Sequence, residues 1–155
     1  MESQENPVVQ KLKGWDPRAV AEVIESKGET TVGVPKEHIQ RVAEFLATEP
    51  SIAFTFLSDI SAVDRFPLEP RFEVNYHLLS LERRDRLRLK VRLPGSDPVI
   101  QTVTSVWPTA NWHERESFDL MGIRFEGHPD LTRIVMPDEW EGHPLRKDYP
   151  VEGYR

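Results

Sequence analysis

The last third of the chain holds histidines and carboxylates whose side chains could perform acid–base or metal chemistry. The tetrapeptide Glu-Gly-His-Pro occurs twice there, at residues 126–129 and 141–144. Imidazole and carboxylate groups are frequent general acids and bases in enzymes, and they are common ligands of zinc. The full set is His113, Glu114, Glu116, Asp119, His128, Asp130, His143 and Asp148. One candidate function is therefore a metal-dependent hydrolase that uses His128, Asp130, His143 and Asp148.

The spacing of these residues does not match a catalytic or metal-binding motif. The chain has no HExxH, no HxH, no EF-hand loop and no serine or threonine in a nucleophile-elbow context. If residues 112–121 form a helix, Glu114 and Glu116 point to opposite sides, which does not suit a paired acid and base. No GxGxxG or GxxxxGK[ST] sequence is present to hold a nucleotide phosphate. We therefore expect no catalytic residue, no cofactor site and no metal ligand in this chain.

Each Glu-Gly-His-Pro copy is typical of a stiff turn. Glycine tolerates a positive φ, and proline drives the preceding histidine into an extended conformation. The residues that follow differ between the copies, Asp130-Leu131-Thr132-Arg133 in one and Leu145-Arg146-Lys147-Asp148 in the other, so a duplicated catalytic unit is not indicated. The repeat is better explained by turn chemistry, in which each copy fixes a bend and holds its imidazole in one direction.

Composition restricts the kinds of partner. With 20 basic and 26 acidic residues and a net charge of -6, the chain has no basic excess for nucleic acid or anionic lipid. It contains no cysteine, which removes disulfides, thiolate nucleophiles and cysteine-held iron–sulfur clusters. No run approaches the ~18 apolar residues of a membrane span, and the start MESQENPVV is unlike a signal peptide. These features predict a soluble protein on the cytosolic side.

The last third must be positioned by the elements that precede it. In the first half of the chain, the hydrophobic period predicts a helix, a strand and a second helix. Residues 1–14 are polar and show no period, which indicates a flexible N-terminal arm. Asp16-Pro17 is typical of a helix start, and the apolar stripe that follows is Ala19, Val20, Val23 and Ile24. A β-branched strand over 30–34 and a second helix over 36–48 complete this half.

The middle of the chain changes to a period of two, which predicts three half-buried strands, around 54–56, 72–78 and 87–93. A short charged turn predicts that the last two form an antiparallel hairpin. The other face of the third strand is a row of four cations, Arg86, Arg88, Lys90 and Arg92. This row is either the solvated face of an outer strand or a surface that meets an acidic partner.

A third helix is predicted over residues 112–121, with Asn111 as its cap, Gly122 as its end, and Arg115 able to pair with Asp119 one turn away. A short strand over 123–125 follows. Beyond it the chain has too little apolar content for a core of its own. We predict one α+β domain over 15–125, with helices on a small mixed, largely antiparallel sheet, and an extended, proline-rich segment over 126–155 that lies either across this domain or across another protein.

Two sequence motifs in the last third are more diagnostic than the hydrophobic periodicity of the chain. One contains Glu114-Arg115-Glu116, then FDLMGI at 118–123 and FEGHPDL at 125–131; the other is EGHPLRKDYP at 141–150. Together they resemble the signature of the thirty-kilodalton subunit of respiratory complex I, known as the C subunit in bacterial NADH:quinone oxidoreductases. Leu57-Ser58-Asp59-Ile60 and Val63-Asp64 are similar to a weaker pattern of that family. Two residues depart from it: Thr132 stands where a basic residue is expected, and Met121 where an aromatic residue is common.

The resemblance implies a cofactor-free, non-catalytic scaffold subunit in the hydrophilic arm of a proton-translocating enzyme. FMN, iron–sulfur clusters and quinone then belong to partner subunits, through which electrons pass from NADH to quinone. The implied partners are the forty-nine-kilodalton or D subunit, the B subunit with the terminal cluster, and further cluster-bearing neighbours. The segment over 126–155 is then expected to dock on these subunits, with both Glu-Gly-His-Pro turns acting by shape to direct residues 129–150 along a groove between them. Since related hydrogenases and ferredoxin- or deazaflavin-dependent quinone reductases use the same family, the electron donor stays open.

The implied location is peripheral, on the cytoplasmic side of the inner membrane of a bacterium or archaeon, with membrane contact only through the complex. We also expect a separate polypeptide, without a fused catalytic subunit. The motif residues to which the resemblance gives interface roles are Glu114, Arg115, Glu116, Asp119, Gly122, His128, Pro129, Asp130, His143, Pro144, Arg146, Lys147 and Asp148.

Overall fold

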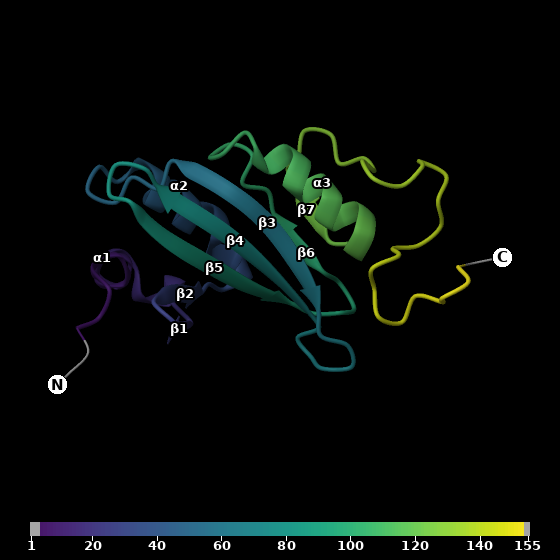
Figure 1. Cartoon of the computed structure of the whole chain (residues 1–155), viewed down its shortest axis with the longest axis horizontal. Helices are drawn as coiled ribbons and strands as arrows, with labels where there is room; N and C mark the ends of the chain where they lie inside the picture. Colours follow the sequence, from purple (N-terminus) through teal and green to yellow (C-terminus); the bar gives the residue numbers. More distant parts are fainter. Residues whose placement is uncertain (1–3, 154–155) are drawn as a thin grey trace.

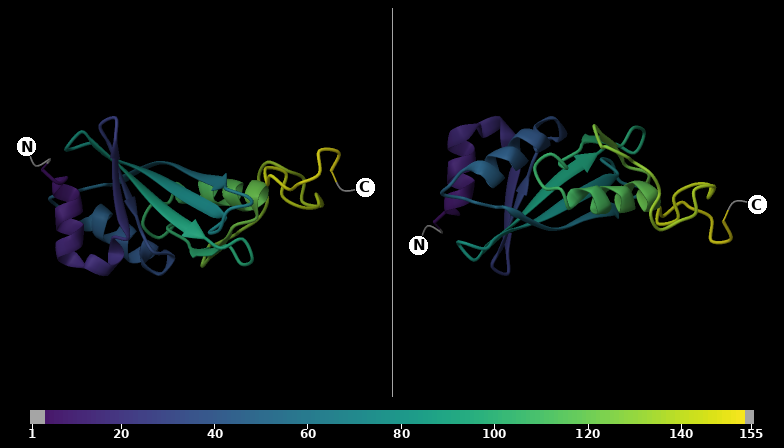
Figure 2. Two further views of the ribbon diagram at one scale, coloured as in Figure 1. Left: turned by 90° about the horizontal axis from the view of Figure 1, so that it is seen from below. Right: turned by 90° about the horizontal axis from the view of Figure 1, so that it is seen from above.

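A five-stranded sheet in the order β1-β2-β5-β4-β3 forms the centre of the computed structural model, which describes residues 4–153. The strands are β1 (Glu22–Ser26), β2 (Glu29–Gly33), β3 (Phe56–Asp64), β4 (Phe72–Ser80) and β5 (Asp85–Leu93). Within this sheet, β2 and β5 are the one pair that runs in parallel. Helices α2 (Ile39–Thr48) and α3 (Ala110–Met121) lie over the same side of the sheet (Figures 1 and 2). The predicted single α+β domain with a mixed, largely antiparallel sheet is confirmed.

The predicted hairpin of β4 and β5 is confirmed, and it supplies the middle of the core. Val74 is paired with Val91 and Tyr76 with Leu89, so the alternating apolar residues of both strands share one face. These side chains are fully buried. They pack in one cluster with Leu46 of α2, which explains why the helices lie on this side of the sheet.

The other side of the sheet, called the open face below, carries the row of cations. The expectation of an outer strand is wrong, because β5 is the central strand of five. The row is largely neutralised within the chain: Arg88 contacts Glu29 at 3.1 Å, Lys90 contacts Glu73 at 3.8 Å, and Arg92 contacts Glu73 and Glu22 at 3.4 and 3.5 Å. The row therefore forms mainly cross-strand ion pairs, and this face offers no large excess of positive charge.

Two expectations for the first 28 residues are wrong. The flexible arm is a helix, α1 (Pro7–Trp15), begun by the Asn6 side chain and buried through Val8, Val9 and Leu12. The helix expected from Asp16 is a single 3-10 turn, η1 (Pro17–Ala19), followed by strand β1. The Asp16 side chain does accept from the backbone N–H of Arg18, so the cap was predicted correctly and the element after it was not.

The remaining elements carry the chain to the last third. A 3-10 turn, η2 (Lys36–His38), leads into α2 as predicted, and β6 (Val99–Gln101) pairs in parallel with β7 (Arg124–Glu126). Helix α3 starts at Ala110, two residues earlier than predicted, with Thr109 instead of Asn111 at the cap position, and ends at Gly122 in the left-handed conformation. After β7, residues 127–153 contain no helix or strand. This stretch, called the C-terminal segment below, lies at the opposite end of the molecule from α1 (Figure 1).

Candidate functional site

Asp119, near the end of α3, is the point at which the C-terminal segment is held most tightly. Its carboxylate is fully buried, and one oxygen accepts the backbone N–H groups of Ile134, Val135 and Met136 at 3.1, 2.7 and 2.8 Å. The other oxygen accepts from Arg133 at 2.7 Å. Burial alone would raise the pKa of this carboxyl, but the donors from Met136, Arg133, Val135 and Ile134 together hold it below its ordinary value. Asp119 is therefore an ionised anchor for four consecutive residues.

The predicted pair of Arg115 with Asp119 is wrong, because Arg133 takes the carboxylate. Arg115 instead donates to the backbone oxygens of Thr132 and Arg133 at 3.1 and 3.2 Å, and its guanidinium lies over the ring of Trp112. Arg133 also donates to the carbonyls of Trp140 and Gly142 at 2.8 and 2.9 Å. Both arginines thus bind the backbone of the C-terminal segment.

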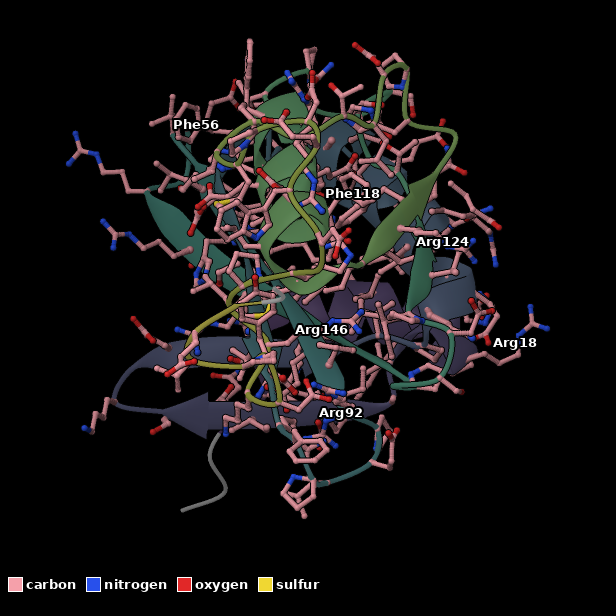
Figure 3. All side chains as sticks on the ribbon, turned by 90° about the vertical axis from the view of Figure 1, so that its right-hand side faces the viewer. Arg18, Phe56, Arg92, Phe118, Arg124 and Arg146 are labelled. Atoms are coloured by element: carbon pink, nitrogen blue, oxygen red, sulfur yellow. The ribbon has the colours of Figure 1, made fainter. Side chains whose placement is uncertain are left out.

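The second Glu-Gly-His-Pro copy completes the C-terminal end of α3. The last four carbonyls of a helix lack partners within the helix. Here the Phe118 carbonyl accepts the N–H of Gly122, and the other three accept from the C-terminal segment: His143 Nδ1 to Asp119 at 2.9 Å, the Leu145 N–H to Leu120 at 3.0 Å and Arg146 Nε to Met121 at 2.7 Å. Figure 3 shows the segment passing across this end of the helix, with Phe118 and Arg146 near it.

Gly122 has two reasons to be glycine. Its φ of +75° lies in the left-handed region, which strains residues with a side chain. In addition, a Cβ at this position would come within 2.5 Å of Arg146 Nη2 and 2.6 Å of His143 Cδ2. The close approach of the segment to the helix end therefore depends on this glycine.

The first Glu-Gly-His-Pro copy contacts the other half of α3. Its glycine, Gly127, has a φ of +82°, as Gly142 has +80°, so the positive φ predicted for both copies is confirmed. His128 Nδ1 accepts the backbone N–H of Asp130 at 3.0 Å, which leaves the ring hydrogen on Nε2, facing the carbonyl of Asn111 at 3.2 Å. The two copies thus grip α3 near its start and at its end, and their histidines do not meet.

Glu114 lies beside His128 and is the least compensated charge of the site. The carboxyl is fully buried; it accepts from Thr102 Oγ1 at 2.5 Å and from the Val103 N–H at 2.8 Å, while His128 Nε2 is 3.9 Å away. Burial outweighs these two hydrogen bonds and raises its pKa to about 7. The buried hydroxyl of Tyr76 has no hydrogen-bond partner among residues 4–153, and its pKa is raised by burial and by the Glu114 charge.

A third contact joins the C-terminal segment to the ends of β3 and β4. Arg71, almost fully buried, donates twice to Asp64 at 2.8 Å and binds Asp148 at 2.7 Å. Asp64 also accepts the N–H of Lys147 at 2.8 Å. The Arg71 hydrogen bonds hold the pKa of Asp64 far below its usual range. The guanidinium groups of Arg71 and Arg146 both lie over the Phe72 ring, at 4.9 and 5.1 Å.

Most of the motif residues named from the sequence take part in these contacts. They do not form one site, because the contacts are three separate groups along the C-terminal segment. Glu116 is exposed, and Pro129 and Pro144 take part through their turns. Four participants were not singled out: Thr102, Arg71, Arg133 and the side chain of Asp64. Asp64 lies 83 residues from Lys147, and Arg71 lies 77 from Asp148. No local spacing could have shown these pairs.

The geometry does not assemble a reaction centre from the candidate residues. His128 and His143 bind different halves of α3, and Asp148 binds Arg71. Across residues 4–153, no group of three histidine, cysteine, aspartate or glutamate side chains could hold a metal ion. Over the same residues, no helix is long and apolar enough to cross a membrane. What the arrangement can do is fix the path of the C-terminal segment.

Comparisons with known proteins agree with the resemblance noted from the sequence. Residues 32–155 match the family described as respiratory-chain NADH dehydrogenase, 30 kDa subunit. The chain is 47% identical over 151 residues to the C subunit of NADH-quinone oxidoreductase of Geotalea uraniireducens, covering 97% of this chain and 91% of the relative. It is 56% identical over 122 residues to the C 2 subunit of the Rhizobium meliloti enzyme, covering 79% of this chain and 66% of the relative's length.

Two solved structures share the fold. The trypsin-resistant fragment of Nqo5 superposes with a TM-score of 0.68 at 34% identity, covering 80% of this chain and 98% of the fragment. A chain of the membrane-bound sulfane sulfur reductase, an archaeal respiratory membrane complex, superposes with a TM-score of 0.76 at 28% identity, covering 93% of this chain and 84% of that one. On the match over 32–155 and these relatives, the chain belongs to the family of the 30 kDa subunit of respiratory-chain NADH dehydrogenase.

Proposed function

We propose that this chain is a cofactor-free scaffold subunit in the hydrophilic arm of a proton-translocating NADH:quinone oxidoreductase. Electrons pass from NADH through FMN and iron–sulfur clusters on other subunits to quinone, and this chain positions those subunits. Its partners are the forty-nine-kilodalton (D) and terminal-cluster (B) subunits, with other cluster-bearing subunits close by. It sits peripherally on the cytoplasmic side of the inner membrane of a bacterium or archaeon.

The observation that carries the proposal is how the motif residues are used. The hydrogen bonds of Asp119, His143 and Arg146 join the C-terminal segment to α3. These bonds fix the backbone of the segment, while apolar side chains remain outside, namely Val135, Trp140, Leu145 and Val151. An ordered backbone with exposed apolar side chains is what a docking surface requires, because the ordering cost is met before binding.

The relatives support the same role. One group is named for quinone reduction, and one structural neighbour belongs to a sulfane sulfur reductase. A subunit shared by two respiratory complexes with different substrates fits a task common to both, which is holding neighbouring subunits in place. It fits poorly with a substrate-specific active site.

The proposal is tested by separating assembly from turnover. In a strain that lacks the gene, the chain is supplied as wild type, Val135→Asp or Trp140→Ser, and intact complex is measured by native electrophoresis together with quinone reduction per complex. We expect both variants to lower the amount of complex and leave turnover per complex unchanged. Leu81→Asp is the matched control, since Leu81 is as exposed but lies in the turn between β4 and β5.

Two results would contradict the scaffold role. One is full assembly with lost turnover in the two variants. The other is stoichiometric metal, flavin or bound NADH in the natively purified, tag-free chain, which would favour a site in the chain itself. The alternative metal-dependent hydrolase predicts that second result, and no contact described above favours it.

A further inference from the structure

Strand β3 has one free edge. It is the last strand of the sheet, and among residues 4–153 it pairs with β4 alone. Its nine residues include no proline and no lysine, and beyond one irregularity between Leu57 and Asp59 it keeps a regular register with β4 up to Asp64. The opposite edge strand, β1, is only five residues long. One edge of this sheet is therefore blunted, and the other can accept a further strand.

A groove of about 160 Å³ runs along the free edge. Four consecutive residues of β3, 59–62, line it, together with Ser117 and Leu120 of α3 and Leu145 of the C-terminal segment. Since consecutive strand residues point to opposite faces, a groove that touches four in a row follows the backbone edge itself. Helix α3 lies beside β3 and forms the other wall (Figure 1).

The groove has a definite chemistry. Two carboxylates, Asp59 and Glu116, line it, and one oxygen of Asp59 lies 3.2 Å from His113 Nδ1, while Ala62, Leu120 and Leu145 give the groove an apolar wall. Phe56 and Val63, near the two ends of β3, are 46% and 42% exposed. Both pair with residues of β4 that lie on the open face, so a strand added at this edge would cover them. The edge thus combines unpaired backbone, apolar surface and negative charge.

We propose that β3 receives an extended segment of a partner subunit as a sixth strand, with a lysine or arginine of that segment at Asp59 and Glu116 and a small apolar side chain in the groove. This deepens the proposed function and rests on it, because it names the kind of segment that a neighbouring subunit inserts. Main-chain hydrogen bonds supply the binding, and the carboxylates select the register.

A second copy of this chain is a poorer occupant. A symmetric pair of β3 strands would bring Asp59 and Glu116 of both copies to the same seam. Like charges placed opposite one another across a strand pair destabilise the pairing. A basic segment from another protein removes this repulsion.

Charge reversal in the assembled complex tests the side-chain part of the proposal. Glu116→Lys should lower the affinity of the chain for the rest of the complex by about fivefold, measured as the yield of intact complex at limiting chain concentration. Glu44→Lys is the matched control, because Glu44 is exposed on α2 and does not line the groove. Equal yields for wild type and both variants would overturn the proposal.

Residue-resolved hydrogen exchange tests the backbone part. In the free full-length chain, every second amide of residues 59–62 points away from β4 and should exchange quickly. In the intact complex those amides should slow by at least about tenfold, because a new strand bonds them. Unchanged exchange in a complex that contains the chain would refute the added strand and leave the scaffold role standing. A chain that never enters the complex would refute the scaffold role first, and a β3-linked homodimer would replace the partner segment by a second copy.

Discussion

Glu114 and Asp119 are both fully buried on α3, yet burial has opposite outcomes for their pKa values. Asp119 receives four donors, including the Arg133 guanidinium, and its pKa stays below the ordinary value. Glu114 receives only a hydroxyl and one backbone N–H, and its pKa rises to about 7. The number and charge of the donors, rather than depth, decide which carboxyl is ionised at neutral pH.

Glu114 should make the stability of the fold depend on pH in one window. Its folded pKa of about 7 exceeds the ordinary 4.5, so the folded state binds more protons between these values. The free energy of unfolding should therefore fall as pH rises from about 4.5 to 7, by on the order of 3 kcal/mol. Glu114→Gln has no titrating proton; its carbonyl can still accept from Val103, and its amide can donate to Thr102 Oγ1 where Glu114 accepts from it, so this variant should remove the fall.

The measurement is denaturant unfolding of both proteins across that window. Other groups change with pH too: the lowered pKa values of His77 and His143 make stability rise with pH below about 6.5, and those of Asp64 and Asp148 act at more acidic pH. The variant keeps all four, so only the difference between the two curves reports on Glu114. A difference that does not change with pH would show that Glu114 titrates as in water.

At the scale of elements, hydrophobic period predicted α2, β4, β5 and most of α3, but it failed in the first 28 residues and at β3. The strand expected around 54–56 begins only at Phe56 and continues to Asp64, because its irregular burial along the sheet edge hides the period of two. Helix α1 carries its own signals, Asn6 before Pro7 and apolar Val8, Val9 and Leu12, but they are few within a polar stretch. The stripe after Asp16 fits a helix by spacing, yet its β-branched residues also suit a strand. Pairing with β2 through a turn with positive φ at Lys27 and Gly28 decides for the strand.

The helical N-terminus leads to a test that the flexible-arm expectation would fail. Leu12 is fully buried and belongs to the main core cluster. Leu12→Ala should lower the free energy of unfolding by about 2–5 kcal/mol, the usual cost of a buried large-to-small change. Gln10→Ala, on the exposed side of the same helix, should change it by less than about 0.5 kcal/mol. Equal melting curves for the two variants would mean that α1 does not pack on the core.

At the scale of the whole molecule, the last third could be read only in part from the sequence. The two Glu-Gly-His-Pro turns, the end of α3 and the extended course of the segment follow from local chemistry. The contacts of Arg71 with Asp148 and of Lys147 with Asp64 join residues about eighty positions apart, so they depend on how the sheet and α3 present their ends. Local sequence therefore predicts the parts of the site, and only the fold brings them together.

At the second Glu-Gly-His-Pro turn, a purely structural role can be distinguished from a role in proton transfer. His143 donates to the Asp119 carbonyl and packs edge-on against Phe118, and Pro144 keeps His143 extended. Pro144→Ala should loosen the turn and weaken docking by about 1–2 kcal/mol for each residue that gains freedom. His143→Gln should be milder, because an amide can still donate to the carbonyl. Both should reduce the yield of intact complex and leave quinone reduction per complex unchanged.

The comparison uses the same two readouts for each variant, with His38→Gln as control, since His38 lies in η2 outside the C-terminal segment. The lowered pKa of His143, caused mainly by burial, favours a ring without charge at neutral pH, as a hydrogen-bonding wedge requires. A role in proton transfer would give a different pattern. The His143→Gln complex would then assemble fully and lose turnover, and the turn could no longer be explained by shape.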